Sequence, residues 1–182
     1  MFAVNITVDG SCDHTQVIAD DELHLYSTDL LRNVDLVVFG RKTYQLFEAY
    51  WPAVAKNQSE TSAVNEFART IDALQKVVFS RTLKKVEWAN TKLLHTHLQD
   101  ETVKLKNQDG KDISICGLSI ASQLAALDLI DEYYFLVQPM VAGKGPRFLG
   151  SHQINESLRL HLVGSARFQS GVIVLHYRRR SV

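Results

Sequence analysis

Hydrophobic residues along the chain fall into short runs, and these runs alternate with segments of helical periodicity. The run Asp35-Leu36-Val37-Val38-Phe39 is apolar at nearly every position, which is typical of a strand buried on both faces of a parallel sheet. From Asp20 onwards apolar side chains recur at helical spacing, and Asp20 or Asp21 can cap the first turn. The pattern predicts strands at residues 2–8, 35–39, 76–80, 91–94, 113–116 and 132–137, and helices from residue 20 and at residues 43–49, 62–74, 98–106 and 119–127.

The C-terminal part of the chain shows a different pattern. Residues 158–168 and 172–178 are strand-like, and the link Gln169-Ser170-Gly171 predicts an antiparallel hairpin between them. The polar segment 52–61 is expected to be a loop. Strand–helix alternation that ends in a hairpin implies an α/β fold of three α/β/α layers, with a mostly parallel central sheet and an antiparallel edge. No linker or repeat interrupts the sequence, so we expect one domain over residues 1–182.

Composition narrows the class of protein. Of the 182 residues 46% are hydrophobic, and 20 basic residues balance 20 acidic ones. This balance excludes a strongly basic nucleic-acid binder and an acidic disordered protein. No apolar run is long enough to cross a membrane. The first residues carry neither a positive segment nor a cleavage site, so a cytoplasmic location is expected.

Cysteine and histidine give little sign of metal or disulfide chemistry. Two cysteines, Cys12 and Cys116, are too few for a disulfide framework, and we expect both to be reduced thiols. Cys116 ends an apolar run and is interpreted as a core residue. His95 and His97 are expected on one strand face, but no third ligand is evident, so no metal site is predicted.

Three turns that follow predicted strands carry polar chemistry. Gly40-Arg41-Lys42-Thr43 follows the buried strand, Ser80-Arg81-Thr82 follows the next one, and Cys116-Gly117-Leu118-Ser119 joins a strand to a helix. Cations, hydroxyl groups and a helix start are the groups that hold a phosphate. The first turn taken alone fits a solvated turn capped by Thr43 equally well, and any single turn is weak evidence. Because the carboxyl ends of parallel strands meet at one edge of a sheet, the three together favour an anion site.

These residues together resemble the dihydrofolate-reductase-like family. The branch they resemble most contains the reductase domain of the bifunctional riboflavin-synthesis deaminase/reductase. The segment from Phe39 to Tyr44 matches the family pattern G-R-x-T-[YW], and the segment from Lys76 to Leu83 matches K-x-V-x-S-[RS]-T. Leu129-Ile130-Asp131-Glu132, followed by Pro139, Gly143 and Gly145, continues the order of the family's motifs.

The resemblance implies NADPH as the cofactor and gives each turn a role. Gly40, Arg41, Lys42 and Thr43 would meet the pyrophosphate, and Gly117, Leu118 and Ser119 would hold its other side. Ser80, Arg81 and Thr82 would hold the adenosine 2′-phosphate. On the substrate side the resemblance points to Asp9, Val141 and Gly143, and it makes Glu22 the candidate proton donor. Helix capping is the competing interpretation for the acidic residues around Glu22.

One position departs from the family pattern. The family has two glycines where this chain has Gly117-Leu118, so Leu118 brings a side chain to a place of close backbone approach. The leading hypothesis is an NADPH-dependent reductase of a small heterocyclic (pterin- or pyrimidine-like) or carbonyl substrate other than dihydrofolate. The alternative, favoured by Leu118, is a non-catalytic nucleotide-binding or structural homologue. Strand 132–137 and the C-terminal hairpin carry enough apolar surface to predict a homodimer.

Overall fold

The computed structural model describes residues 1–150 and 158–180. The chain forms two compact units, one made of Met1–Ile18 with Leu118–Val182 (unit 1) and one made of Ala19–Gly117 (unit 2). A single domain over residues 1–182 therefore stays a prediction, and it includes residues 151–157 and 181–182, which lie outside the described part of the chain.

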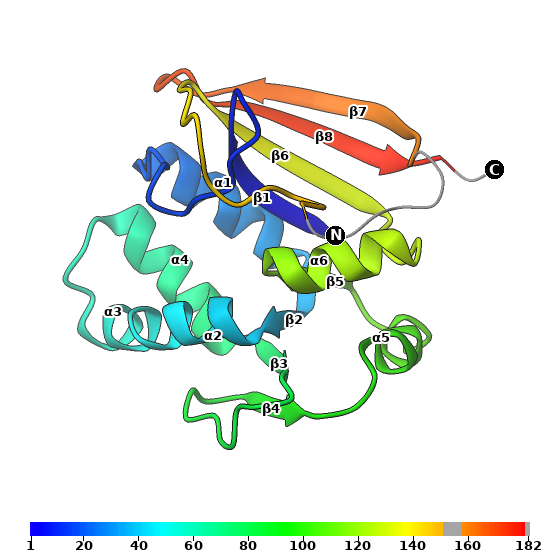
Figure 1. The fold of residues 1–182 in the computed structure, drawn as a ribbon. Helices are drawn as coiled ribbons and strands as arrows, with labels where there is room; N and C mark the ends of the chain where they lie inside the picture. Colours follow the sequence, from blue (N-terminus) through cyan, green and yellow to red (C-terminus); the bar gives the residue numbers. More distant parts are fainter. Residues whose placement is uncertain (151–157, 181–182) are drawn as a thin grey trace. The chain divides into compact units, whose positions relative to one another are not determined.

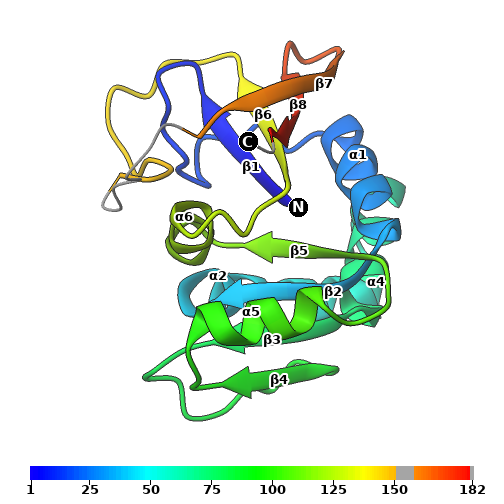
Figure 2. The same ribbon diagram turned by 90° about the vertical axis from the view of Figure 1, so that its right-hand side faces the viewer.

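Unit 2 is built on four parallel strands in the order β4-β3-β2-β5 (Figure 2). The central strand β2 is the apolar run singled out in the sequence, and Val37, Val38 and Phe39 are all 0% exposed. Burial on both faces is confirmed by the helices, because α5 lies on one side of these strands and α4 on the other (Figures 1 and 2). The elements of unit 2 are α1 (Asp21–Arg32), β2 (Val34–Gly40), α2 (Arg41–Glu48), α3 (Trp51–Asn57), α4 (Ser62–Ala73), β3 (Gln75–Phe79), β4 (Thr91–Leu94), α5 (Leu98–Lys106) and β5 (Asp112–Cys116).

Helices α1 and α4 pack against each other, and both have capped N-termini. Asp20 accepts a hydrogen bond from the Leu23 N–H at 2.8 Å, and Thr61 accepts one from the Val64 N–H at 3.4 Å. Each cap satisfies one of the amides that a helix start leaves unpaired. The predicted cap at Asp20 is thus confirmed.

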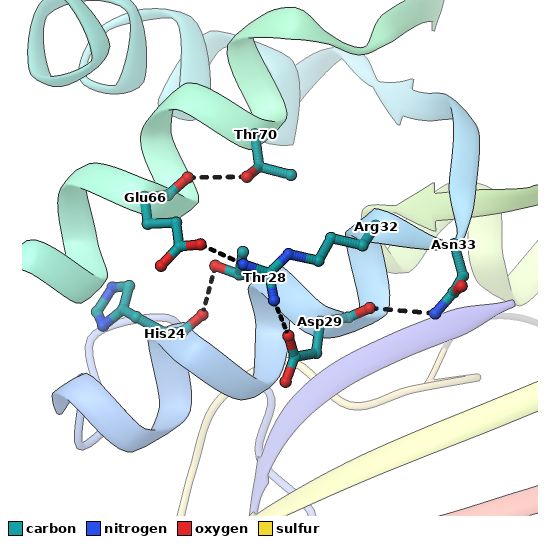
Figure 3. Close-up of polar contacts among 7 residues, drawn as sticks. All are labelled: His24, Thr28, Asp29, Arg32, Asn33, Glu66 and Thr70. Carbon is teal, nitrogen blue, oxygen red and sulfur yellow. Dashed lines mark hydrogen bonds and ion pairs between the residues drawn. The ribbon is translucent and has the colours of Figure 1, made fainter.

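A polar network ties α1 to α4 on the exposed side of this pair (Figure 3). The Arg32 guanidinium reaches Asp29 on its own helix and Glu66 on α4. Thr28 and Thr70 instead turn their hydroxyls back onto the carbonyls of His24 and Glu66, each at 2.8 Å. Exposed ion pairs contribute little stability. Buried side chains, such as His24 of α1 and Phe67 of α4 whose rings meet edge to face with centroids 5.9 Å apart, therefore contribute more to holding the two helices together.

The expected loop at residues 52–61 is wrong over its first half, because Trp51–Asn57 forms helix α3. Pro52 lies in the first turn of this helix, where the missing N–H costs nothing. Gln58 ends the helix in the left-handed conformation, with φ 52°. A seven-residue helix gives too few turns for a periodic pattern to appear in the sequence.

Unit 1 contains the strand order β1-β6-β8-β7 (Figure 1). Strands β1 and β6 pair in parallel, whereas β8 pairs antiparallel with both β6 and β7. The predicted mostly parallel arrangement with a C-terminal antiparallel hairpin is therefore confirmed. The elements of unit 1 are β1 (Phe2–Thr7), α6 (Leu118–Ala126), β6 (Glu132–Gln138), β7 (Leu160–Arg167) and β8 (Ile173–Arg179).

The hairpin turns through Gly171, whose φ of +90° is a conformation that favours glycine. Phe168 donates its N–H to the Val172 carbonyl at 2.9 Å and closes the turn. Strand β7 leaves Leu162 and Val163 about half exposed. In the described part of the chain, no helix combines the length and the apolar character needed to span a membrane.

Candidate functional site

Three adjacent parallel strands of unit 2 end at the same level. Gly40 at the end of β2 pairs with Phe79 of β3, and Phe39 pairs with Cys116 of β5. The turns that leave these strands therefore start side by side, as the sequence predicted from their order. We call these segments, residues 40–43, 80–82 and 117, the strand-end turns. Ligands of parallel α/β sheets bind at this kind of edge.

The first strand-end turn opens helix α2. Gly40 occupies the N-cap position, and no side chain caps the helix. The first amides of α2 therefore keep their capacity to donate to an anion. Arg41 contacts only its helix neighbour Gln45, at 3.2 Å, and Lys42 is exposed without a polar partner in the described residues.

The second strand-end turn is fixed through Ser80. Its N–H donates to the Leu94 carbonyl at 3.1 Å, and its Oγ accepts from the amides of Thr82 and Leu83 at 3.2 and 2.9 Å. The hydroxyl hydrogen of Ser80 remains available to a ligand. Arg81 is exposed, and its guanidinium makes no hydrogen bond or ion pair with any described residue. The turn is thus rigid, and its cation is unpaired.

Gly117 brings the third strand-end turn against the first. Its φ is +121°, and a β-carbon there would lie 2.8 Å from Thr43 Oγ1 and 3.5 Å from the Gly40 nitrogen. Thr43 is β-branched and stiff, so it cannot easily make room. Only glycine fits at position 117, which explains one of the two glycines of the family pattern.

Leu118 and Ser119 follow as the first residues of α6. Among the described residues, non-glycine positions with positive φ are Gln58, Asn90, Asp128 and Leu149. Leu118 is not one of them, so its backbone conformation is open to any side chain. The conformational need for glycine lies at position 117. Ser119 is exposed, and its carbonyl accepts a hydrogen bond from Gln123 at 3.0 Å.

A different kind of arrangement joins two loops of unit 1, residues 7–12 and residues 139–147, which we call the loop clamp. Asp9 lies at its centre and accepts hydrogen bonds from the Thr7 hydroxyl at 2.6 Å, the Ala142 N–H at 3.0 Å and the Gly143 N–H at 2.8 Å. The bond from Thr7, with those from the two amides, lowers the pKa of Asp9 to about 2. The carboxylate is therefore ionised at neutral pH, and most of its acceptor capacity is used.

Further contacts close the loop clamp along its length. Val8 donates its N–H to the Met140 carbonyl at 3.0 Å, and Cys12 donates to the Pro146 carbonyl at 2.7 Å. Arg147 reaches the Asp9 carbonyl. A β-carbon at Gly145 would collide with Ser11 Oγ, so the two loops approach closely.

Two predicted substrate residues lie on the outer part of the loop clamp. The Val141 side chain is 73% exposed, which leaves it open to a ligand. Gly143 has φ +73° and open space beside its α-carbon, but its N–H is held by Asp9. The structure thus brings Asp9, Val141 and Gly143 together. Direct substrate contact by any of them stays a prediction.

Glu22 lies in the first turn of α1, where a carboxylate is favoured by the helix dipole. The capping role falls to Asp20, and Asp21 accepts a hydrogen bond from Thr61 Oγ1 at 2.5 Å. Glu22 therefore does not cap α1 through the Leu23 amide, and its role as proton donor stays a prediction.

The two histidines after β4 differ from the expectation. The strand ends at Leu94, and His97 occupies the N-cap position of α5, so His95 and His97 do not share a strand face. His95 Nδ1 lies 2.6 Å from the Ser80 carbonyl oxygen, a contact that sequence reasoning missed. Nothing in a single sequence signals it, because it depends on the register of β3 against β4.

Neither a metal centre nor a reactive thiol is evident near the strand-end turns. Within residues 1–150 and 158–180, no cluster of three His, Cys, Asp or Glu side chains could hold a metal ion. Burial raises the pKa of the Cys116 thiol to about 12, so this group is protonated at neutral pH. The chemistry available at the strand-end turns is anion binding by amides, hydroxyls and cations.

Comparisons with known proteins agree with the fold. The chain is 30% identical to the uncharacterized protein YyaP of Bacillus subtilis (strain 168) over 152 residues, which are 82% of this chain and 77% of YyaP. Its fold is similar to that of a putative riboflavin biosynthesis protein from Shewanella sp. PV-4, with a TM-score of 0.72 and 17% identity over 99% of this chain and 98% of that one.

A second solved structure relates the chain to part of a larger protein. This is the diaminohydroxyphosphoribosylaminopyrimidine deaminase/5-amino-6-(5-phosphoribosylamino)uracil reductase of Thermotoga maritima. The TM-score is 0.66 at 14% identity, over 98% of this chain and 56% of that protein. The family model for the RibD C-terminal domain matches residues 1–174. The chain therefore belongs to the family of the RibD C-terminal domain and has its dihydrofolate-reductase-like fold.

Proposed function

We propose that this protein is an NADPH-dependent reductase that transfers a hydride to a small heterocyclic, pterin- or pyrimidine-like, or carbonyl substrate. The observation that carries the proposal is the set of strand-end turns at the carboxyl ends of β3, β2 and β5. They combine unpaired cations, free hydroxyl hydrogens and uncapped amides at one edge of a parallel sheet. Membership of the RibD C-terminal domain family supports a reductase.

The residues of unit 2 fit the phosphates of this cofactor. The amides at the start of α2 suit the pyrophosphate, and Gly117 leaves room for its close approach to the backbone. Arg81, with the hydroxyls of Ser80 and Thr82, suits a phosphate monoester such as the adenosine 2′-phosphate. When bound, NADPH supplies the hydride. The contribution of the chain is to bind and orient it through these groups.

On the substrate side we propose separate roles for two residues, Val141 in the loop clamp and Glu22 at the start of α1. The loop clamp holds Val141 in a fixed, exposed position, where it can contact a substrate ring. Glu22 is the carboxyl group proposed to deliver the proton that accompanies the hydride. A pyrimidine ring is favoured among the substrate classes, because the Thermotoga maritima relative is named as a reductase of an aminouracil.

A turnover assay tests this function. The protein is incubated with NADPH and a panel of aminouracil phosphates, pterins and small carbonyl compounds, and the fall in NADPH absorbance is followed. We expect oxidation of NADPH with at least one aminouracil or pterin, and loss of that rate in the variant Glu22→Gln. NADPH binding without turnover across the whole panel would favour a non-catalytic nucleotide-binding protein. Leu118 has no positive φ, so the backbone itself does not argue for that alternative, and the effect of the Leu118 side chain on cofactor binding is left to this assay.

A further inference from the structure

His95 occupies the place where the pairing of β3 with β4 ends. The register aligns Phe79 with Leu94, and the Ser80 N–H continues the ladder to the Leu94 carbonyl at 3.1 Å. Beyond this point β4 leaves the ladder, so no backbone amide of that strand reaches the Ser80 carbonyl. The imidazole of His95 takes that place, with Nδ1 2.6 Å from the carbonyl oxygen.

The chemical nature of the two groups shows which of them carries the hydrogen of this bond. A carbonyl oxygen only accepts hydrogen bonds, so the hydrogen lies on Nδ1 of His95. In a trans peptide the C=O and the following N–H point in opposite directions. By holding the Ser80 carbonyl on the β4 side, His95 therefore directs the Arg81 N–H away from β4. This amide donates to no described backbone carbonyl and is free for a ligand.

We propose that His95 is a positioning residue for the phosphate-binding turn 80–82, and that it contributes to discrimination between NADPH and NADH. The inference rests on the proposed function of this turn. With its N–H, carbonyl and hydroxyl oxygen all engaged, Ser80 cannot rotate its carbonyl toward a bound phosphate, where the oxygen would repel the anion. A turn that is fixed before binding loses less entropy when the phosphate arrives.

The test compares variants that separate the hydrogen bond from the rest of the ring. His95→Leu keeps a bulky side chain without a donor, whereas His95→Asn places an amide N–H on the same γ-carbon that carries Nδ1. His97→Leu is the matched control, because His97 is also an exposed histidine and its side chain makes no polar contact within the described chain. Both sites, His95 and His97, are at the surface, so the three variants should fold, and thermal unfolding checks this.

Affinities for NADPH and NADH are measured by calorimetry. We expect His95→Leu to weaken NADPH binding about three- to tenfold, the effect of one hydrogen bond, and to leave NADH binding within about twofold. His95→Asn and His97→Leu should both bind NADPH within about twofold of the parent protein.

Three results would overturn this inference and leave the proposed function standing. One is NADPH binding by His95→Leu at parental strength, and another is an equal loss for NADPH and NADH. The third is weak binding by His95→Asn, because the N–H would then not be the group that matters. Absence of NADPH binding by the parent protein would overturn the proposed function itself, and the role of His95 with it.

Discussion

The strand-end turns of unit 2 and the loop clamp of unit 1 both collect polar groups, but they use them differently. In the turns, Arg81 and Lys42 have no polar partner in the part of the chain that the structure describes. In the clamp, the carboxylate of Asp9 accepts three hydrogen bonds from its own chain. Polar groups without partners inside the protein can form hydrogen bonds or ion pairs with a ligand. Polar groups that are already hydrogen-bonded within the protein instead hold its loops in place.

This difference separates binding from support among the predicted residues. Arg81 can form a new charge-assisted bond when a phosphate arrives, because it gives up only water. The carboxylate of Asp9 would have to give up one of its hydrogen bonds from a backbone amide before it could accept most hydrogen bonds from a ligand. We therefore assign phosphate recognition to the turns, and we assign to Asp9 the support of the segment that carries Val141.

The largest expected effect comes from filling the space at Gly117. Gly117→Ala places a β-carbon against Thr43 in a conformation with φ +121°. We expect a stability loss of ~1–3 kcal/mol from backbone strain. We also expect a loss of about a hundredfold in affinity for both NADPH and NADH, since they share the pyrophosphate.

The matched control for this change is Gly164→Ala in β7. Nothing lies within 4 Å of a β-carbon built there, and the position shows no positive φ. It should bind both cofactors as the parent does. Unchanged cofactor binding by Gly117→Ala would remove the third turn from the site.

A more selective effect is expected from Arg81→Ala. One charge-assisted hydrogen bond contributes ~1.5–3 kcal/mol, so NADPH affinity should fall about tenfold or more while NADH affinity stays nearly constant. Titration of both cofactors measures this, with Lys84→Ala as an exposed cationic control from the same segment. If both cofactors lose affinity equally, Arg81 does not hold the 2′-phosphate.

Changes to the loop clamp should affect the stability of the protein at acid pH and should not affect cofactor binding. The folded protein holds the pKa of Asp9 at about 2, below the ordinary 3.8. Its contribution to stability is therefore complete above about pH 4 and is lost as the pH falls toward 2. Asp9→Asn should lower the unfolding midpoint at neutral pH, because its amide group faces backbone N–H donors, and should lose less stability across this acid range.

Acid unfolding of the parent protein and of Asp9→Asn tests this role of the carboxylate. Two superimposable acid-unfolding curves for the parent and Asp9→Asn would show that the clamp does not depend on this carboxylate. Cofactor affinity should be within about twofold of the parent in Asp9→Asn, since one hydrogen-bonded group outside the strand-end turns is changed.

Substitutions on the exposed surface of the C-terminal hairpin are expected to have the smallest effect on cofactor binding at the strand-end turns. Leu162, Val163 and Ile173 are 50%, 45% and 44% exposed, and we propose that a second copy of the chain covers them. Light scattering should give twice the mass of one chain, and Val163→Asp should shift it toward the monomer. Val103→Asp, at a valine of α5 that is 39% exposed, is the control. A monomeric parent protein at micromolar concentration would contradict the dimer.

Much of the fold could be read from the sequence because local patterns carry it. Continuous apolar runs identified β2 and β3, and the link at Gly171 identified the hairpin. Helix α3 was not predicted because it is short and has a proline, Pro52, in its first turn. The strand-end turns could be located because they follow those runs directly.

The details of the site depend on contacts between distant residues, and these leave no local signal. The partners of Asp9 at Ala142 and Gly143 are more than a hundred positions away. The contact between His95 and Ser80 depends on strand register. The pattern alone also does not show which residue of Gly117-Leu118 needs the freedom of glycine. The φ values place that need at Gly117, and the effect of the Leu118 side chain on cofactor binding stays a prediction.

We propose above that the strand-end turns bind a cofactor with a 2′-phosphate. Thermal unfolding of the parent protein with increasing NADPH or NADH tests it most directly. A ligand that binds only the folded state adds about 2.7 kcal/mol of stability at a hundred times its dissociation constant. We predict that NADPH raises the midpoint at concentrations about tenfold or more below those that NADH requires. An equal response to both cofactors, or none to either, would contradict the account.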